Sequence, residues 1–362
     1  MNEQIIKSIF VKLLKKHYFC IHKFIGISKK RKIYYLLHSG KNSKVKFFIK
    51  AYIRQCVPGW VTRRLLESKL KQLQSRDDKE EILRRVDYYC KLTPETSYDH
   101  EGFNKTAVSL KDQPVIQPKV YYFDAMDTAR YFDQRLRWIL KPGDVADLQA
   151  LPTILKSRPI GDHNQCSVVL NLNKVRHFLF VNDPRPWREK RDMAIFRGDV
   201  GNPKDGNVKP NRVAFMNRWY GHPLVDAASI DSIDGHPEWQ REKMTIGEHL
   251  DYKFVMSLEG NDVASNLKWV MSSNSIAVTP RLTCETWFME GTLIPNYHYI
   301  EVKPDFSDLE ERLTYYIQHP EEAEAIIRHA HEFVAQFMDP KRERLISLLV
   351  LKKYFDVTNA AL

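Results

Sequence analysis

From about residue 120, the chain alternates short runs of β-branched and aromatic residues with longer segments in which apolar residues recur every three or four positions. Short apolar runs are typical of buried strands, and the longer period is typical of helices that pack on a sheet through one face. The predicted strands are 120–124, 167–172, 177–181, 194–198, 253–258, 275–280 and 297–302. The predicted helices are 127–140, 212–220, 261–274, 308–318 and 320–338. This alternation predicts an α/β protein with a parallel sheet.

The segment before residue 120 follows another pattern. Residues 60–92 space apolar residues three and four positions apart without a proline and predict helix. Residues 93–118 contain three prolines and predict a connecting segment. At roughly 150 residues per domain, the length of 362 residues suggests two domains. We divide the chain into four parts: residues 1–92, 93–190, 191–338 and 339–362.

Positive charge is concentrated at the N-terminal end. Residues 1–75 hold 18 Lys and Arg against two acidic residues, whereas the formal net charge of the whole chain is +11. Within residues 5–14, apolar residues recur at helical spacing beside lysines, which predicts a basic amphipathic helix that lies on an anionic membrane. A solvated tail and a nucleic-acid-binding arm are the alternatives, although no zinc-finger, RRM-like or helix-turn-helix pattern accompanies the charge.

Several classes of protein are disfavoured. No run of about 20 apolar residues predicts a membrane span. Lysines interrupt the apolar stretch near the N-terminus and no small-residue cleavage site follows it, so we expect no signal peptide and a cytoplasmic protein. Five scattered cysteines do not suggest a disulfide scaffold, and the histidines show no metal-binding spacing. The glycine motifs of dinucleotide-binding enzymes and P-loop NTPases are absent.

Two stretches are suited to an anionic ligand. In residues 196–212 a predicted strand runs into a loop that carries four cations and three glycines, so that backbone and guanidinium groups can approach phosphate oxygens. In residues 252–278 a strand, a Gly260-Asn261-Asp262 turn and a predicted helix follow each other, which would point free N–H groups at an anion. In open parallel sheets, ligands bind beyond the carboxyl ends of strands.

These stretches carry the sequence motifs of a known family. FRG (196–198) precedes the basic loop, EGND (259–262) precedes AS-x-x-K-W (264–269), and SNS (273–275) and NYHYI (296–300) follow. In this order the motifs resemble glycosyltransferase family 90, which includes bacterial lipopolysaccharide-core glycosyltransferases, capsule-associated proteins and eukaryotic protein O-glucosyltransferases. Residues 151–160 and 171–183 resemble its bacterial lipopolysaccharide branch, and the resemblance covers roughly residues 120–302.

The resemblance implies a GT-B-like fold of two Rossmann-like lobes, here with a basic, mainly helical N-terminal extension. It also implies transfer of a sugar, with inversion, from a nucleotide donor that is usually UDP-linked. The chain contains no Asp-x-Asp triplet, the carboxylate pair that holds a metal on the pyrophosphate in metal-dependent sugar transferases. We therefore expect no metal and no cofactor, with cations and helix N–H groups stabilising the leaving diphosphate.

Carried over onto this sequence, the resemblance implies a set of donor-binding residues. Asn266 departs from the eukaryotic branch, which has arginine there, so Lys268 or Arg212 would take over its phosphate contact. Glu285 would bind the ribose hydroxyls or only cap a helix. The expected donor-binding residues are Arg197, Gly198, Asp199, Arg212, Gly260, Asn261, Asp262, Val263, Ala264, Ser265, Asn266, Lys268 and Glu285.

An inverting transfer also needs one general base that takes the proton of the acceptor hydroxyl. In the eukaryotic relatives this base is an Asp on a loop after an early strand, and the corresponding region here is 139–159. Asp144 is the first candidate and Asp147 the second, while either could simply cap a turn. Lys156 and Arg158 nearby are either structural or face acceptor phosphates.

Together these observations predict an inverting hexosyltransferase that moves glucose or galactose from UDP-glucose or UDP-galactose to the lipopolysaccharide inner core. Residues 1–92 would bind the anionic inner face of the inner membrane, 93–190 would form the acceptor-side lobe, 191–338 the donor-binding lobe, and 339–362 a C-terminal helix. The alternatives are a glycosyltransferase of capsule or another surface polysaccharide, and a nucleic-acid-binding protein; we expect no nucleic acid as partner. A non-catalytic scaffold on the membrane surface is a further alternative.

Overall fold

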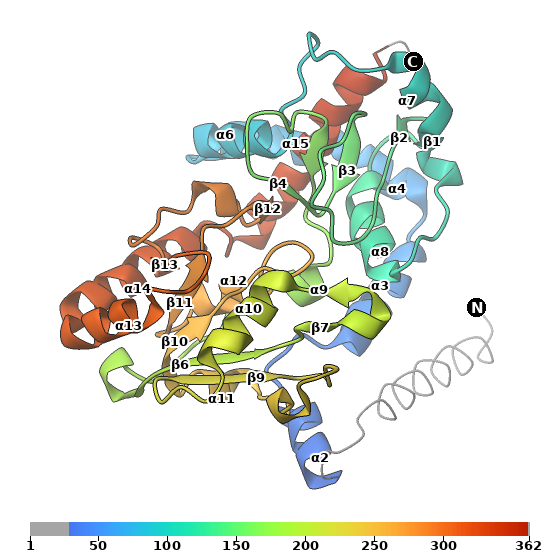
Figure 1. Cartoon of the computed structure of the whole chain (residues 1–362). Helices are drawn as coiled ribbons and strands as arrows, with labels where there is room; N and C mark the ends of the chain where they lie inside the picture. Colours follow the sequence, from blue (N-terminus) through green and yellow to red (C-terminus); the bar gives the residue numbers. More distant parts are fainter. Residues whose placement is uncertain (1–28, 361–362) are drawn as a thin grey trace.

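A computed structural model describes residues 29–360, and its central element is a sheet of five parallel strands in the order β13–β11–β10–β6–β9 (Figure 1). Along the chain the strands are β6 (Arg191–Gly198), β9 (Val225–Ser229), β10 (Tyr252–Met256), β11 (Ile276–Pro280) and β13 (Ile300–Val302). The chain runs from β6 outward to β9, returns past β6 to β10, and then continues to β11 and β13. The strand order therefore reverses between β6 and β10, which is the point where open α/β sheets bind ligands.

Apolar side chains cover this sheet on both faces. Alternate residues of β10 belong to different clusters of the core, because successive strand residues point to opposite faces: Phe254 and Met256 pack in one cluster and Val255 in the other. The helices of this half are α10 (Pro210–Trp219), α11 (Ile246–His249), α12 (Leu267–Met271), α13 (Leu309–Gln318) and α14 (Pro320–Ala335). The predicted α/β class is confirmed, with strands in five of the predicted segments, four of them in this sheet. Strand β9 was not predicted, because Val-Asp-Ala-Ala-Ser has little β propensity.

The other half of the described chain is mainly helical and carries pairs of short strands. Its helices are α2 (Lys29–His38), α3 (Lys44–Gln55), α4 (Gly59–Arg64), α5 (Leu66–Lys71), α6 (Lys79–Tyr89), α7 (His100–Thr106), α8 (Lys119–Ala129) and α9 (Lys174–His177), and α15 (Pro340–Thr358) returns to pack against α6 and α8. The two-lobed GT-B arrangement and the four-part division stay predictions.

The remaining strands form four pairs. The paired strands are β1 (Val108–Ser109) with β2 (Arg137–Trp138), β3 (Thr153–Leu155) with β5 (Ser167–Val169), β4 (Ser157–Pro159) with β12 (Cys284–Thr286), and β7 (Gly201–Asn202) with β8 (Asn207–Val208). Short 3₁₀ helices are η1 (Gln72–Ser75), η2 (Leu110–Asp112), η3 (Trp187–Glu189), η4 (Pro203–Asp205), η5 (Pro237–Trp239) and η6 (Glu290–Thr292). Since β4 comes from the first half and β12 from the second, this pair ties the two halves of the chain together.

Several predicted elements need correction. The predicted strand 120–124 is part of helix α8, where packing against α3 and α15 outweighs the β propensity of its aromatic residues. The helix predicted over 127–140 is wrong beyond Ala129, because α8 ends there and residues 137–138 form β2. Residues 177–181 form no strand. The helix predicted over 261–274 begins only at Leu267, and the helix predicted over 60–92 is divided into α4, α5, η1 and α6.

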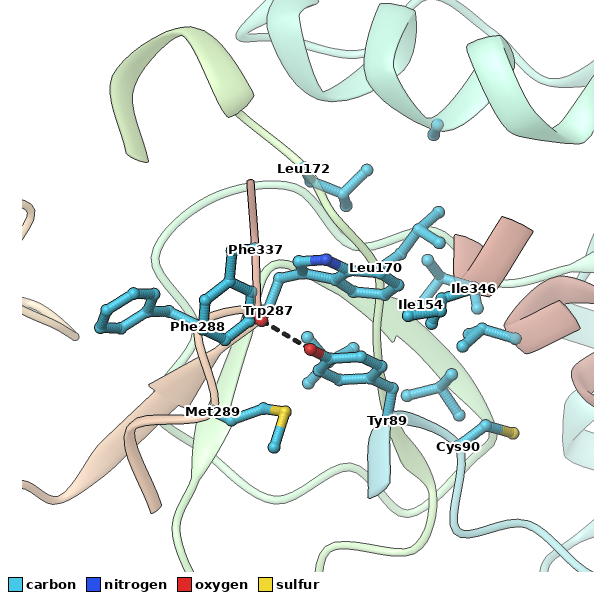
Figure 2. Packing of buried hydrophobic residues seen from close by; sticks show 14 of the residues in the cluster. Tyr89, Cys90, Ile154, Leu170, Leu172, Trp287, Phe288, Met289, Phe337 and Ile346 are labelled. Atoms are coloured by element: carbon cyan, nitrogen blue, oxygen red, sulfur yellow. Dashed lines mark hydrogen bonds between the residues drawn. The ribbon is translucent and has the colours of Figure 1, made fainter. Parts of the chain in front are cut away.

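A buried aromatic pair joins the two halves (Figure 2). The Tyr89 ring of α6 stacks on the Trp287 indole with centroids 3.9 Å apart, and the Tyr89 hydroxyl donates to the Trp287 carbonyl oxygen at 2.7 Å. Ile154 of β3 and Ile346 of α15 surround the pair. Stacked aromatic pairs stabilise a core by roughly 0.5–1.5 kcal/mol beyond the area they bury, so this contact helps to fix the two halves against each other.

Two further points concern the membrane. Each helix in residues 29–360 is too short or too polar to cross a bilayer. The amphipathic helix predicted within residues 5–14 lies outside the described residues.

Candidate active site

A cavity of about 400 Å³ opens at the carboxyl ends of β6 and β10. Two segments form much of its wall: residues 199–209, called the β6 loop, which contain the hairpin β7–β8, and residues 257–266, called the β10 loop. The two segments expected from the sequence to bind one anion therefore lie on the same cavity. The predicted residues that line it are Asp144, Arg197, Gly198, Asp199, Arg212, Gly260, Asn261, Asp262, Val263, Ser265 and Asn266.

Arg212 connects the two loops. Arg212 lies in the first turn of α10. Its guanidinium donates to the carbonyl oxygens of Asp199 at 2.8 Å, Leu258 at 2.6 Å and Glu259 at 3.1 Å. Gly260 leaves room for this contact, because a Cβ there would lie 3.0 Å from Arg212 Nη2. Burial lowers the pKa of Arg212 to about 10, against the opposing attraction of Asp199. The group is therefore charged at neutral pH.

The other predicted cations of the cavity are already paired. The Arg197 guanidinium donates to Asp226 Oδ1 at 2.7 Å, and Lys209 Nζ lies 2.5 Å from Asp199 Oδ2. In contrast, Arg212 binds only backbone oxygens and forms no ion pair with a carboxylate of the described residues. Of the cations that line the cavity, Arg212 thus keeps a buried charge that an anionic ligand can neutralise.

The β10 loop differs from its predicted form. Because α12 starts at Leu267, residues 260–266 form a loop with its own backbone bonds, and Gly260 N donates to the Asp262 carbonyl oxygen at 2.9 Å. Asn266 donates to the Met256 carbonyl oxygen at 3.0 Å, so it holds the loop to the end of β10. The expectation of a helix N-terminus at Gly260 is therefore corrected.

The two candidate bases lie in different surroundings. Asp144 lines the cavity with its side chain one-fifth exposed, whereas Asp147 is largely exposed and pairs with Lys141 at 3.0 Å outside the cavity lining. Lys156 Nζ lies 2.5 Å from Asp144 Oδ1. Burial raises the pKa of Asp144, but the charge and hydrogen bond of Lys156 outweigh it and hold the pKa below the usual value. The geometry places Asp144, rather than Asp147, at the site.

Three predicted residues do not reach the cavity lining. Lys268 is fully buried and pairs with Glu290 at 2.6 Å. Glu285 is fully buried between Arg158, whose Nε lies 2.7 Å from Oε1, and the Tyr88 hydroxyl. Ala264 is buried in the core beneath the loop. The phosphate contact of Lys268 and the ribose contact of Glu285 stay predictions. The buried ion pairs do not favour them, because both side chains are already occupied by protein partners.

Sequence reasoning missed several lining residues. Lys41 lies in the basic segment that was expected only to bind the membrane. Arg176 lies within residues 171–183, where its positive charge was the one sign that it could bind an anion. His249 had no motif around it. Burial lowers the pKa of His249 to about 4, although the hydrogen bond between its Nδ1 and the Thr245 carbonyl oxygen opposes this, so the ring is neutral at pH 7.

The charge of the cavity favours an anion. Lining cations outnumber carboxylates six to three: Lys41, Arg176, Arg197, Lys209, Arg212 and Lys243 against Asp144, Asp199 and Asp262. Within residues 29–360, no three His, Cys, Asp or Glu side chains gather where they could hold a metal ion. Metal independence itself stays a prediction.

An α/β protein with a cationic cavity at the reversal of its strand order is typical of enzymes that bind phosphorylated ligands. The sequence pattern of glycosyl transferase family 90 matches residues 171–358. The chain is 35% identical over 316 residues to the O-glucosyltransferase LpsA of Dichelobacter nodosus, across 87% of this chain and 96% of that protein. The chain therefore belongs to glycosyl transferase family 90 and is a glycosyltransferase.

More distant relatives match a shorter part. Protein O-glucosyltransferase 1 of Rattus norvegicus is 25% identical over 162 residues, which cover 41% of this chain and 38% of that protein. The O-glucosyltransferase rumi of Drosophila pseudoobscura pseudoobscura is 22% identical over 174 residues, which cover 47% of this chain and 42% of that protein.

The unpaired charge of Arg212 leads to the first prediction. Arg212→Gln should weaken binding of inorganic pyrophosphate by about tenfold, because a charge-assisted hydrogen bond contributes roughly 1.5–3 kcal/mol. Isothermal titration calorimetry measures the change, and thermal unfolding checks that the variant is folded. Arg188→Gln is the matched control, since Arg188 pairs with Glu321 and Glu324 at the surface. Equal pyrophosphate affinity in both variants would remove Arg212 from the anion site.

Proposed function

We propose that the protein is an inverting, metal-independent hexosyltransferase with a GT-B arrangement that moves glucose or galactose from a UDP-sugar to a lipopolysaccharide inner-core oligosaccharide. The observation that carries the proposal is the cavity itself: the buried charge of Arg212 and the carboxylate of Asp144 line the same space at the strand reversal. The names of the relatives, O-glucosyltransferases, favour glucose among the two sugars. A capsule or other surface polysaccharide is the alternative acceptor.

The chemistry of such a transfer needs both groups. Asp144 takes the proton of the acceptor hydroxyl while the hydroxyl oxygen attacks the anomeric carbon. The bond between that carbon and the diphosphate oxygen breaks, and the electron pair leaves with the diphosphate. Arg212, fixed in advance by three carbonyl oxygens, stabilises this negative charge as it develops.

The base assignment gives the second prediction. Asp144→Asn should lower sugar transfer from UDP-glucose or UDP-galactose by about 10²–10⁴-fold, the usual contribution of a general base. UDP affinity, measured by calorimetry, should change little. Asp147→Asn is the control, because Asp147 lies outside the cavity lining, and it should keep full transfer activity. The reverse result, with Asp147→Asn inactive and Asp144→Asn active, would move the base to Asp147.

The third prediction concerns the metal. Because Arg212 supplies positive charge where metal-dependent enzymes place a divalent ion, transfer should survive an excess of EDTA with less than about a twofold loss. The measurement is the initial rate of UDP release with and without added Mn²⁺ or Mg²⁺. A strict requirement for either ion would contradict the proposal.

Membrane attachment is the remaining part of the proposal, with the protein on the cytoplasmic face of the inner membrane. The supporting observation is on α2 and α3, which carry both lysines and exposed apolar side chains. On α2, Ile33, Leu36 and Leu37 are 59%, 63% and 71% exposed, and on α3 Ile53 is 63% exposed. Exposed aliphatic side chains among cations suit an anionic lipid surface.

This surface gives the fourth prediction. Leu36→Asp/Leu37→Asp should lower binding to phosphatidylglycerol vesicles by about fivefold or more, because two apolar side chains are lost and two negative charges are added. Co-sedimentation measures the bound fraction. Ile294→Asp/Met338→Asp is the matched control, since both residues are more than half exposed elsewhere on the molecule. Unchanged vesicle binding, together with tight binding of duplex DNA at physiological salt, would favour the nucleic-acid alternative.

A further inference from the structure

Lys156 is a buried cation between two carboxylates of the cavity. It lies between β3 and β4, and its side chain is 1% exposed. Its Nζ is 2.5 Å from Asp144 Oδ1 and 2.6 Å from Asp262 Oδ2. Asp262 belongs to the β10 loop, so one ammonium group joins the candidate base to the loop expected to bind the donor.

With both carboxylates ionised, Lys156, Asp144 and Asp262 carry a net charge of −1. The Asp262 side chain is 3% exposed, and its Oδ2 accepts no well-directed hydrogen bond, so its contact with Lys156 is mainly ionic. Burial raises the pKa of Asp262 and the charge of Lys156 opposes this, whereas the pKa of Asp144 is lowered. The geometry places one ammonium group between two carboxylates, so a single positive charge is shared by two acidic side chains.

Other titratable groups face this cluster. Arg176 Nη1 of α9 lies 3.8 Å from Asp144 Oδ1 and is half exposed, so it is a weaker partner than Lys156. The Tyr121 hydroxyl of α8 is near Asp144 and helps to lower the pKa of Asp144, so it favours the ionised form. His177 of α9 is near Lys156, and burial lowers its pKa well below the usual value, so it is neutral. Lys156 is thus the closest buried charge that acts on Asp144.

We propose that Lys156 and Asp262 are positioning residues that act as a pair on Asp144: Lys156 orients Asp144 and keeps it ionised, and Asp262 offsets the charge of Lys156 so that Asp144 remains basic enough to take a proton. This inference rests on the proposed role of Asp144 as the base. A lone ammonium 2.5 Å away would make Asp144 a weak base, and without any ammonium the carboxylate would be neutral over more of the pH range.

The proton balance of the transfer supports this arrangement. Before transfer, Asp144 and Asp262 are both ionised beside the charged Lys156. When Asp144 receives the proton of the acceptor hydroxyl, Lys156 and Asp262 remain as a neutral ion pair, and no buried charge is left without a partner. When that proton leaves to solvent, the starting state returns.

The test uses two substitutions with opposite expected effects on the pH profile of kcat/KM. Lys156→Met removes the positive charge, so the acid limb of the profile should move up by roughly one to two pH units. Asp262→Asn leaves Lys156 with Asp144 alone, so the acid limb should not move to higher pH. The plateau value of kcat/KM should fall, because Asp144 is then a weaker base. Lys156→Met/Asp262→Asn removes both charges and should bring the limb back toward its wild-type position. Lys156→Arg should restore the wild-type limb.

These outcomes separate a positioning role from a structural one. A purely structural Lys156 would lower activity in the Lys156→Met variant without moving the limb, and that result would overturn the proposal. An upward shift in Asp262→Asn would overturn it as well, which keeps the proposal testable if Lys156→Met does not fold.

A second readout does not need turnover. Infrared spectra of protein labelled with ¹³C at the aspartate carboxyl groups, taken as differences from Asp144→Asn, follow the protonation of Asp144 directly. They should show the same upward shift in Lys156→Met, and the absence of a shift counts against the inference. If the wild-type protein transfers no sugar but the infrared shift is present, the proposed function fails and the inference about Lys156 and Asp144 stands.

Discussion

The cavity depends on one partly buried guanidinium, that of Arg212. Arg212 donates to three carbonyl oxygens that belong to two loops, one after β6 and the other after β10. Carbonyl oxygens carry only partial charges, so they satisfy its hydrogen bonds without neutralising it. A charge that is largely removed from water and has no ion-pair partner is poorly stabilised, so an anion that enters the cavity is favoured. The contact that shapes the cavity therefore also gives it its preference for negative ligands.

The neighbouring charges have a different role, because they neutralise each other. Arg197 pairs with Asp226, Lys209 with Asp199, and Lys156 with Asp144 and Asp262. Such pairs fix side-chain positions before any ligand binds, and charged groups fixed in advance need little rearrangement during a reaction. A count of cations in the sequence overstates the positive charge offered to a ligand, since each of these cations is paired with a carboxylate at least 10 residues away along the chain.

The difference between local sequence signals and contacts between distant residues explains how much of the fold and site could be predicted. Except for β9, the strands of the central sheet follow from local apolar runs, and the meeting of the β6 loop and β10 loop follows from the rule that parallel strands end at one edge. Lys268 could not be assigned, because its partner Glu290 is 22 residues away along the chain and both are fully buried. Helix α8 was predicted as a strand because its aromatic residues have high β propensity, while the packing that decides its conformation comes from α3 and α15.

The segment between α2 and α3 connects the basic N-terminal helices to the cavity. Between α2 and α3, the Ser39 carbonyl oxygen accepts from Ile246 N, and Asn42 donates to the Phe178 carbonyl oxygen. Ile246 begins α11 beside the cavity, and Phe178 follows α9, which carries Arg176, so the segment is bonded to both halves while Lys41 lines the space between them. Arg31 of α2 binds Glu248 at 2.6 Å, which fixes that helix to α11. If α2 lies on a lipid surface, as proposed, these contacts would hold α11 and the cavity close to that surface.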